Sequence, residues 1–302
     1  NIILLKTLLF TIILFSLNSV LLSVLNGQKE LIKLVLANIT ASIFSLFFTS
    51  FLIVQNEIVG ALYALVLNQS VVFFITLLFL IKTPWFKMKY FIQGVDKKSL
   101  SKLAKFSLMA ITSALTVPVS HLIIRNYIGE NLSWDDAGYW QAMWYISSMY
   151  LMVITTSLGV YYLPKLSEIK DKKELTLEII SGYKVIMPVV ICLAVLIFAF
   201  KEYVILIAFS DEFIGMSDLF KWQLIGDVVK IASWLIGYVT LAKAMVKIYI
   251  SLEILGSLSF VLLSMYCVDT YGLVGITYAY TINYIMYLFI MIFIYMRYVN
   301  QK

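Results

Sequence analysis

The sequence predicts an all-α polytopic membrane protein with nine transmembrane helices. Nine apolar stretches with few or no charges fill most of the 302 residues, and each approaches the about 20 residues that a helix needs to cross a lipid core. Hydrophobic residues make up 62% of the chain and charged residues only 13%, against about 25% in soluble proteins. Lysines collect in every second gap, as they do in loops on the cytoplasmic side of a membrane.

The first three spans are expected at Thr7–Leu25, Leu34–Val54 and Ile58–Ile81. The first ends where Gly27 and charged residues follow the apolar run. A gap of only three residues separates the second span from the third. A connection this short favours antiparallel neighbours.

The residues 82–105 form a basic connector with seven lysines, and this is the best candidate for a boundary between two helical bundles. A second charged connector is expected at Lys165–Glu178. The remaining six spans, all within residues 106–302, are expected at Phe106–Ile124, Ala137–Tyr162, Val185–Phe200, Leu219–Ala242, Ile248–Val268 and Tyr271–Met296.

The charge of the gaps predicts the orientation of the chain. The gaps after the first, third, fifth and seventh spans, with the tail, contain 18 of the 23 Lys and Arg residues, whereas the opposite side contains three. The rich side is therefore assigned to the cytoplasm, with a cytoplasmic C-terminus. The chain begins at Asn1 without a methionine or a signal-peptide pattern. Because such proteins usually start inside, we expect an odd number of spans to be missing.

The seventh span is the only one with several charges, and Gln223, Asp227 and Lys230 share one face of it at helical spacing. Charges inside a membrane are costly and are tolerated when they face a cavity or a partner. One interpretation is a polar stripe along a water-filled pathway. The other is a self-neutralising pair of Asp227 and Lys230 that only fixes helix packing.

The fourth span contains His121 and Arg125, one turn apart. Arg125 could bind a phosphate with two hydrogen bonds, or it could extend to the interface as an anchor. The depth of the side chain decides between these, and the sequence leaves it open. His121 is interpreted as a polar group between helices or, less simply, as a proton relay.

Trp140, at the start of the fifth span, is interpreted as part of an interfacial aromatic belt, and both Trp140 and Gln141 could instead contact a sugar. Glu253 lies one turn inside the eighth span on the basic side. We expect it to pair there with Lys243 or Lys247.

The sequence predicts a protein that is not an enzyme. It contains no phosphate-binding Walker loop and no HExxH, GxSxG or CxxC motif, and no gap could hold a soluble catalytic domain. With two cysteines and one histidine, a metal site is improbable, and no cofactor is expected. The loop bias explains the net charge of +6, so nucleic acid is not an expected partner. Transport is the economical interpretation.

Four stretches of the chain are similar to the Wzx-type flippases of lipid-linked oligosaccharides, which belong to the multidrug, oligosaccharidyl-lipid and polysaccharide exporter superfamily. The stretches are Leu103–Ser113, Ser133–Gln141, Val160–Ser167 and Asp218–Lys243. Before Leu103 the resemblance rests mainly on the pattern of spans.

The resemblance implies twelve helices in two six-helix bundles around a central cavity. Residues 1–81 would then be the last three helices of the N-terminal bundle, with three helices missing. The implied function is movement of an undecaprenyl-pyrophosphate-linked oligosaccharide, an O-antigen unit or lipid III, from the cytoplasmic to the periplasmic leaflet of the bacterial inner membrane. The implied partners are this polyprenyl-linked oligosaccharide, membrane lipid and other membrane proteins of polysaccharide assembly.

Arg125, Asp227 and Lys230 match motif positions of the family, whereas His121 departs from the aromatic residue expected there. On this basis Arg125 and Lys230 supply positive charge to the cavity, and Asp227 holds Lys230 in place. Two alternatives stay open. A cation-coupled multidrug exporter of the same superfamily would show acidic residues deep in the membrane. A membrane-bound glycan polymerase or acyltransferase would favour a large outer loop.

Overall fold

The computed structural model describes residues 2–28, 30–81, 83, 86 and 96–300. Within these ranges the chain is almost wholly helical and forms no strand. Six helical stretches of this described part are long and apolar enough to cross a membrane. The predicted all-α polytopic membrane fold is therefore confirmed. The chain divides into two compact units, Asn1–Val95 and Asp96–Lys302.

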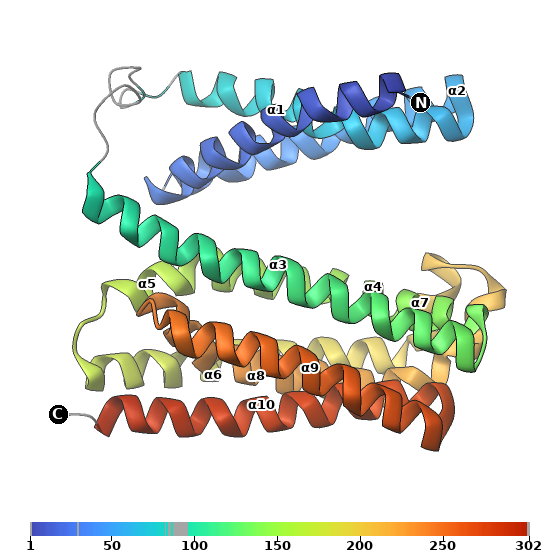
Figure 1. The fold of residues 1–302 in the computed structure, drawn as a ribbon, viewed down its shortest axis with the longest axis vertical. Coiled ribbons are helices and arrows are strands. Elements are labelled where there is room, and N and C mark those ends of the chain that lie inside the picture. The colour runs from blue at the N-terminus through green and yellow to red at the C-terminus, as the bar shows by residue number, and fades with distance from the viewer. Residues whose placement is uncertain (1, 29, 82, 84–85, 87–95, 301–302) are drawn as a thin grey trace. The chain divides into compact units, whose positions relative to one another are not determined.

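The first unit consists of α1 (Ile2–Gly27) and α2 (Leu31–Ile81), which pack against each other (Figure 1). α2 is interrupted at Asn56 and Glu57, whose backbone angles are not helical, and Glu57 has a φ of 47°. Close packing follows at the interruption, because a Cβ on Gly60 would lie 1.9 Å from the carbonyl oxygen of Leu52. The predicted second and third spans are thus two helices joined by a kink.

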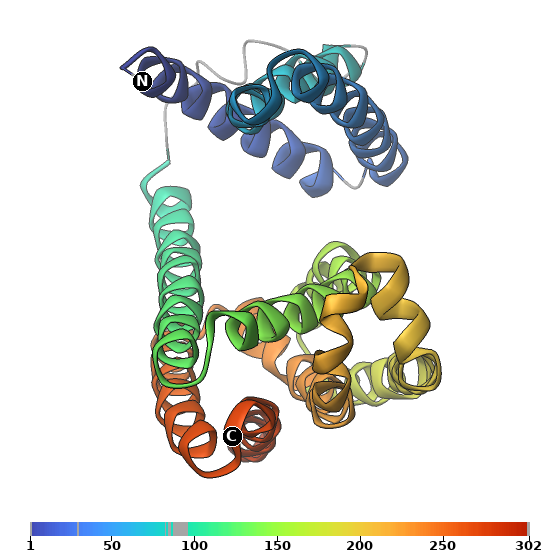
Figure 2. The same cartoon turned by 90° about the vertical axis from the view of Figure 1, so that its right-hand side faces the viewer.

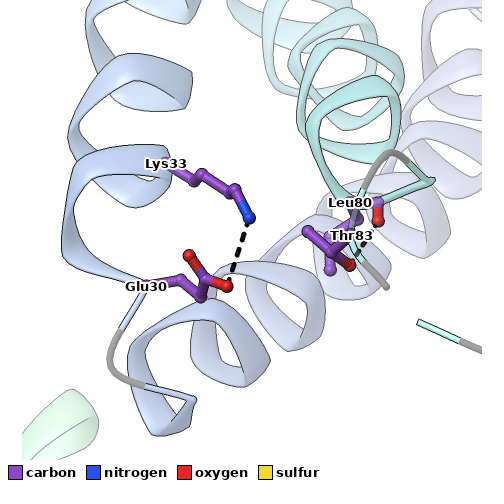
Figure 3. Close-up of polar contacts among 4 residues, drawn as sticks. All are labelled: Glu30, Lys33, Leu80 and Thr83. Carbon is purple, nitrogen blue, oxygen red and sulfur yellow. Dashed lines mark hydrogen bonds and ion pairs between the residues drawn. The ribbon is translucent and has the colours of Figure 1, made fainter. Parts of the chain in front are cut away.

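Polar side chains join the helices of the first unit. The Ser70 hydroxyl donates to the Thr11 carbonyl at 3.3 Å and so links α2 to α1. Figure 3 shows two contacts near the ends of these helices. Glu30 and Lys33 form an ion pair at 3.1 Å, and the Thr83 hydroxyl donates to the Leu80 carbonyl at 2.6 Å beyond the end of α2.

The second unit contains the remaining helices, several of which run with their axes roughly aligned (Figure 1). α3 packs along α9 and less extensively along α4 (Figure 2). The elements are α3 (Lys97–Asn131), α4 (Trp134–Ser157), the π-helix η2 (Leu158–Tyr162), α5 (Leu163–Glu168), α6 (Lys172–Ala199), α7 (Lys201–Ala208), the 3₁₀ helix η3 (Asp211–Leu219), α8 (Phe220–Ala242), α9 (Val246–Tyr271), the 3₁₀ helix η4 (Gly272–Val274) and α10 (Gly275–Asn300).

Local chemistry explains where several of these helices begin and end. The Ser133 hydroxyl accepts from the Asp136 amide at 3.0 Å and starts α4, and the Asp171 carboxylate accepts from the Glu174 amide at 2.9 Å and starts α6. Such side chains satisfy amides that have no partner within the helix. Gly272 ends α9 with a φ of 64°, a left-handed conformation that glycine adopts without a steric penalty.

Each predicted span falls within a helix to within a few residues, but both charged connectors are shorter than predicted. α3 already begins at Lys97, and α6 begins at Lys172, so much of each connector is helical. The lysines at positions 82, 87 and 89, with Pro84, lie outside the described residues. The reason for the difference is that lysine and glutamate favour helices, so hydrophobicity alone underestimates helix length.

α8 is the central helix of the second unit. It packs most extensively against α10 and α6 and also contacts α4, α5 and α9. Its buried side chains contribute to two hydrophobic clusters, one around Leu235 and one around Phe220. The polar residues of α8 are therefore placed among neighbours from several helices, and these neighbours decide what each residue can do.

Candidate functional site

Asp227 lies in the centre of the helical packing of the second unit and is fully buried. Its carboxylate accepts a hydrogen bond from the Tyr150 hydroxyl of α4 at 2.9 Å and another from the Tyr280 hydroxyl of α10 at 2.8 Å. A carboxylate that is taken out of water needs such donors. Asp227 thus links three helices through its two oxygens.

Lys230 is half-buried and follows Asp227 by three residues on α8. Its ammonium nitrogen lies over three aromatic rings, 5.0 Å from the centre of Trp234, 5.6 Å from Tyr284 and 5.9 Å from Tyr280. Aromatic faces attract a cation electrostatically. The ammonium therefore has a defined position over these rings, without an ion pair among the described residues, while the charge of Asp227 attracts it from nearby.

Asp227 and Lys230 attract each other electrostatically but form no ion pair among the described residues, so the prediction that Asp227 holds Lys230 in place stays a prediction. Ion pairs that the structure does contain include Glu30–Lys33 and Lys165–Glu178. The tyrosine hydroxyls of α4 and α10 occupy both carboxylate oxygens of Asp227, and Lys230 turns to the rings. Tyr280 connects the two residues, because its hydroxyl bonds to Asp227 and its ring lies beneath Lys230.

Gly226 makes room for this arrangement. A Cβ at this position would lie 2.4 Å from Cδ1 of Tyr280 and 3.0 Å from the hydroxyl oxygen of Thr281. The Thr281 hydroxyl in turn donates to the Trp222 carbonyl at 2.7 Å. α8 and α10 therefore approach closely at the level of Asp227, and glycine is needed because it has no side chain.

A cavity of about 430 Å³ opens beside Lys230, wholly within the second unit. Its size falls within the roughly 300–1,000 Å³ that is typical of ligand pockets. Aromatic rings dominate the lining, and small polar groups lie between them. The lining side chains of these two kinds are Trp144, Trp234, Tyr238, Tyr249, Phe260, Tyr280, Tyr284, Tyr287, Ser113, Ser120, Ser257 and Asn283.

His121 also lines the cavity and is held among aromatic rings. It stacks on Trp140 with the ring centres 5.2 Å apart, meets Trp144 edge-on at 4.8 Å, and lies 6.2 Å from Phe260. His121 therefore packs as an aromatic side chain would, and the family resemblance leads us to expect an aromatic residue at this position.

Five of the seven predicted site residues do not line this cavity. Trp140 is buried behind His121, so the prediction that it contacts sugar is not supported here. Gln223 is buried and donates to the Ser147 hydroxyl at 3.3 Å, a packing contact between α8 and α4. Gln141 is half-buried on α4, and Asp227 is covered by its tyrosines.

Arg125 is exposed on α3, one turn beyond His121. Within the part of the chain that the structure describes, its side chain has no ion pair and does not line the cavity beside Lys230. Both interpretations of Arg125, a phosphate contact and an interfacial anchor, stay predictions.

The predicted pairing of Glu253 with Lys243 or Lys247 is wrong. Glu253 lines the cavity and has no ion pair among the described residues. Lys243 follows the end of α8 and donates to the carbonyl groups of Leu166 and Ile169 at the end of α5. These carbonyls have no partner within their helix and therefore compete for the lysine.

The tyrosines of α10 were not predicted as site residues. Tyr280, Tyr284 and Tyr287 recur at intervals of four and three, which places them on one helical face toward the cavity. This spacing was the available signal, but tyrosines in a membrane helix are more often expected at its ends. In the described ranges, no cluster of His, Cys, Asp and Glu could hold a metal ion.

Solved structures show which known fold this chain has. The chain is similar to a multidrug resistance MATE family transporter of the MOP superfamily in its outward-facing conformation, with a TM-score of 0.79 and 14% identity over 93% of this chain and 66% of that chain. A MATE structure in the bent conformation gives 0.82 and 13% over 97% and 67%. A MOP superfamily transporter from Pyrococcus furiosus gives 0.77 and 13% over 94% and 67%. At this identity the likeness shows the fold, which is that of MOP superfamily transporters.

The sequence places the chain in a family. Residues 2–218 match the model of the polysaccharide biosynthesis protein family, and the chain belongs to it. It is 33% identical over 228 residues to the Lipid III flippase of Escherichia coli (strain K12) and equally to that of Shigella flexneri. The match covers 76% of this chain and 55% of each relative, so the chain spans about half the length of the curated relatives it matches. The resemblance to flippases of lipid-linked oligosaccharides is confirmed.

Proposed function

We propose that this protein moves a polyprenyl-pyrophosphate-linked oligosaccharide from the cytoplasmic to the periplasmic leaflet of the bacterial inner membrane. An O-antigen unit or lipid III is the proposed substrate, supported by the identity to lipid III flippases. The observation that carries the proposal is Lys230, an ammonium group without an ion pair among the described residues, which lines an aromatic and polar cavity.

The cavity suits the chemistry of such a head group. A pyrophosphate carries negative charge, and the Lys230 ammonium offers three donors for it. Sugar rings have apolar C–H faces and many hydroxyls, and the lining offers aromatic faces beside serine, asparagine and tyrosine groups. Both parts of the head group thus find partners in one space.

The head group needs this shelter because hydrocarbon offers no hydrogen bonds. Polar groups in an apolar environment without partners are strongly disfavoured, by roughly 2–7 kcal/mol for each neutral group. A cavity that replaces water with fixed partners removes most of this penalty. The lipid tail can stay in the bilayer while the head group crosses.

We further propose the arrangement that the charge pattern predicts. Residues 1–81 belong to the N-terminal bundle as its last three helices, residues 82–105 connect the bundles on the cytoplasmic side, and residues 106–302 form the six-helix C-terminal bundle with a cytoplasmic C-terminus. Alternating opening of the cavity to the two sides would then move the head group across, as in other transporters built from repeated bundles.

Deletion of the full gene tests the proposed function. Analysis of lipid-linked intermediates should then show build-up of a complete oligosaccharide unit that stays in the cytoplasmic leaflet. Normal turnover of this unit in the deletion strain would overturn the proposal. Complementation with Lys230→Ala should fail at wild-type protein level, and Arg125→Ala tests separately whether the exposed arginine takes part.

One observation favours a second function, a cation-coupled drug exporter. Glu253 places a carboxylate without an ion pair among the described residues in an aromatic cavity, an environment that also suits an organic cation. This function predicts that the deletion strain becomes sensitive to cationic dyes while polysaccharide assembly stays normal. The flippase function predicts the reverse.

A further inference from the structure

The cavity contains a second charged group, and the transport of an anion does not explain it. Glu253 lies on α9, whereas Lys230 lies on α8, and both line the same space without forming an ion pair. A carboxylate would repel a pyrophosphate that lies close to it. If the cavity receives an anionic head group, Glu253 must therefore face another part of that molecule.

The surroundings of Glu253 differ from those of Lys230. Three helices meet here, and the Ser113 hydroxyl of α3 is hydrogen-bonded to the Tyr249 hydroxyl of α9 at 2.8 Å. Tyr287 of α10 lies across from two glycines, because a Cβ on Gly237 would lie 3.7 Å from its hydroxyl and a Cβ on Gly256 would lie 3.9 Å from its ring. Hydroxyls and aromatic rings thus line the cavity together with the Glu253 carboxylate, and the glycines leave space there.

A carboxylate in such a place accepts hydrogen bonds and donates none. Its bonds with neutral donors are charge-assisted and about twice as strong as bonds between neutral groups. The donors that fit are neutral, because a second anion is repelled. The Ser113 hydroxyl supplies one such donor to the Glu253 carboxylate, and a ligand can supply more. Neighbouring hydroxyls of a sugar, or a hydroxyl and an acetamido N–H, have this character.

We propose that Glu253, with Ser113 and Tyr249, forms a subsite for a neutral sugar residue of the transported head group, while Lys230 binds the phosphate. This inference rests on the proposed function. It fixes the orientation of the head group in the cavity and makes Glu253 a residue that selects the sugar. A site that bonds to sugar donors also discriminates against ligands without them, since its own polar group then stays unpaired.

Two probes separate this inference from the proposed function. The first is undecaprenyl pyrophosphate, which has no sugar, and the second is the same lipid carrying one N-acetylglucosamine. Binding of each is measured with the protein expressed from its full gene in lipid nanodiscs. The wild type is expected to bind both, and to bind the sugar-bearing lipid about tenfold more tightly, the gain of one charge-assisted hydrogen bond.

Glu253→Ala is expected to remove this sugar-dependent gain and to leave the affinity for the sugar-free lipid unchanged or higher. Glu253→Gln keeps an acceptor oxygen and should retain part of the gain, and it replaces the alanine variant if that variant does not fold. Lys230→Ala should weaken both lipids. Glu130→Ala serves as the matched control, because Glu130 is an exposed carboxylate on α3 outside the cavity.

An undiminished sugar-dependent gain in both Glu253 variants would overturn the sugar subsite, and so would an equal loss for both lipids. Tight binding of tetraphenylphosphonium that Glu253→Gln abolishes, together with no sugar-dependent gain in the wild type, would also overturn it. Failure of the wild type to bind either lipid would instead overturn the proposed function.

Discussion

Asp227 and Lys230 lie one turn apart on α8, yet they belong to two different regions of the second unit. Asp227 is fully buried, and both of its oxygens accept from tyrosines of neighbouring helices. Lys230 lines the cavity over three aromatic rings without an ion pair among the described residues. The first region is closed and satisfied, and the second is open and unsatisfied.

A charge inside a membrane helix can therefore serve packing or ligand binding, and its hydrogen-bond partners decide which. A carboxylate whose bonds are complete within the protein has little left for a ligand. An ammonium group that is held over aromatic faces keeps its hydrogen-bond donors available for a ligand. Substitutions in the closed region should therefore change the stability of the protein, and substitutions in the open region should change ligand binding.

The largest loss of stability is expected for Asp227→Ala. This variant leaves the hydroxyls of Tyr150 and Tyr280 buried without their acceptor, and hydrogen bonds to a charged group contribute about 1.5–3 kcal/mol each. We expect a loss of several kcal/mol in the free energy of unfolding, measured by thermal unfolding in detergent. Asp211→Asn, at an exposed position of η3, is the control and should unfold like the wild type. Equal stability of Asp227→Ala and Asp211→Asn would contradict the conclusion that the hydrogen bonds to Asp227 stabilise the closed region.

A smaller loss is expected for Gly226→Ala, because the added Cβ would lie 2.4 Å from the Tyr280 ring. Overpacking of this kind destabilises by about 1–3 kcal/mol. Gly138→Ala on α4 is the matched control, since its Cβ would meet nothing within 4 Å. In the same unfolding measurement the control should be neutral or slightly stabilised, and a loss as large as that of Gly226→Ala would contradict the close approach of α8 and α10.

Tyr280→Phe should lower stability by about 1–2 kcal/mol, because it removes one of the two hydrogen bonds to Asp227. The ring beneath Lys230 remains, so binding of a phosphate-bearing lipid should change little. The variant thus separates the two functions of Tyr280. A large loss of lipid binding at near-normal stability would mean that the closed and open regions are coupled through the Tyr280 hydroxyl.

The smallest effect on stability is expected for Lys230→Gln. The substitution of Lys230 breaks no ion pair among the described residues, and the lost attraction of the half-buried ammonium to the aromatic faces is worth about 0.5–1.5 kcal/mol. Thermal unfolding should show a difference within this range. A loss as large as that of Asp227→Ala would place Lys230 in the closed region with its neighbour.

The fold could be predicted almost completely from the sequence, because membrane helices depend on local hydrophobicity and length. The kink at Asn56 and Glu57 lies within the three polar residues, 55–57, that separate two apolar stretches. The start of α3 at Lys97 was missed, since a helix that leaves the membrane continues in water without an apolar signal.

The site could be predicted only in part. Spacing along α8 identified Asp227 and Lys230 as unusual charges, but it could not show that tyrosines of α4 and α10 bond to both oxygens of Asp227. The sequence shows that Glu253 is close to lysines along the chain, and this predicted an ion pair at the membrane rim. It does not show the carbonyl groups of Leu166 and Ile169, which accept from Lys243 instead. Contacts between helices far apart in sequence decide such cases.

The most direct test of the account compares two lysines of α8. Lys221 is exposed and also lies over an aromatic ring, 5.8 Å from the centre of Trp222, but it does not line the cavity. Binding of undecaprenyl pyrophosphate to nanodiscs with Lys230→Gln and Lys221→Gln is the measurement. We expect about a tenfold or greater loss of affinity for Lys230→Gln, which is the contribution of one charge-assisted contact, and no loss for Lys221→Gln. Equal affinity of the two variants would contradict it.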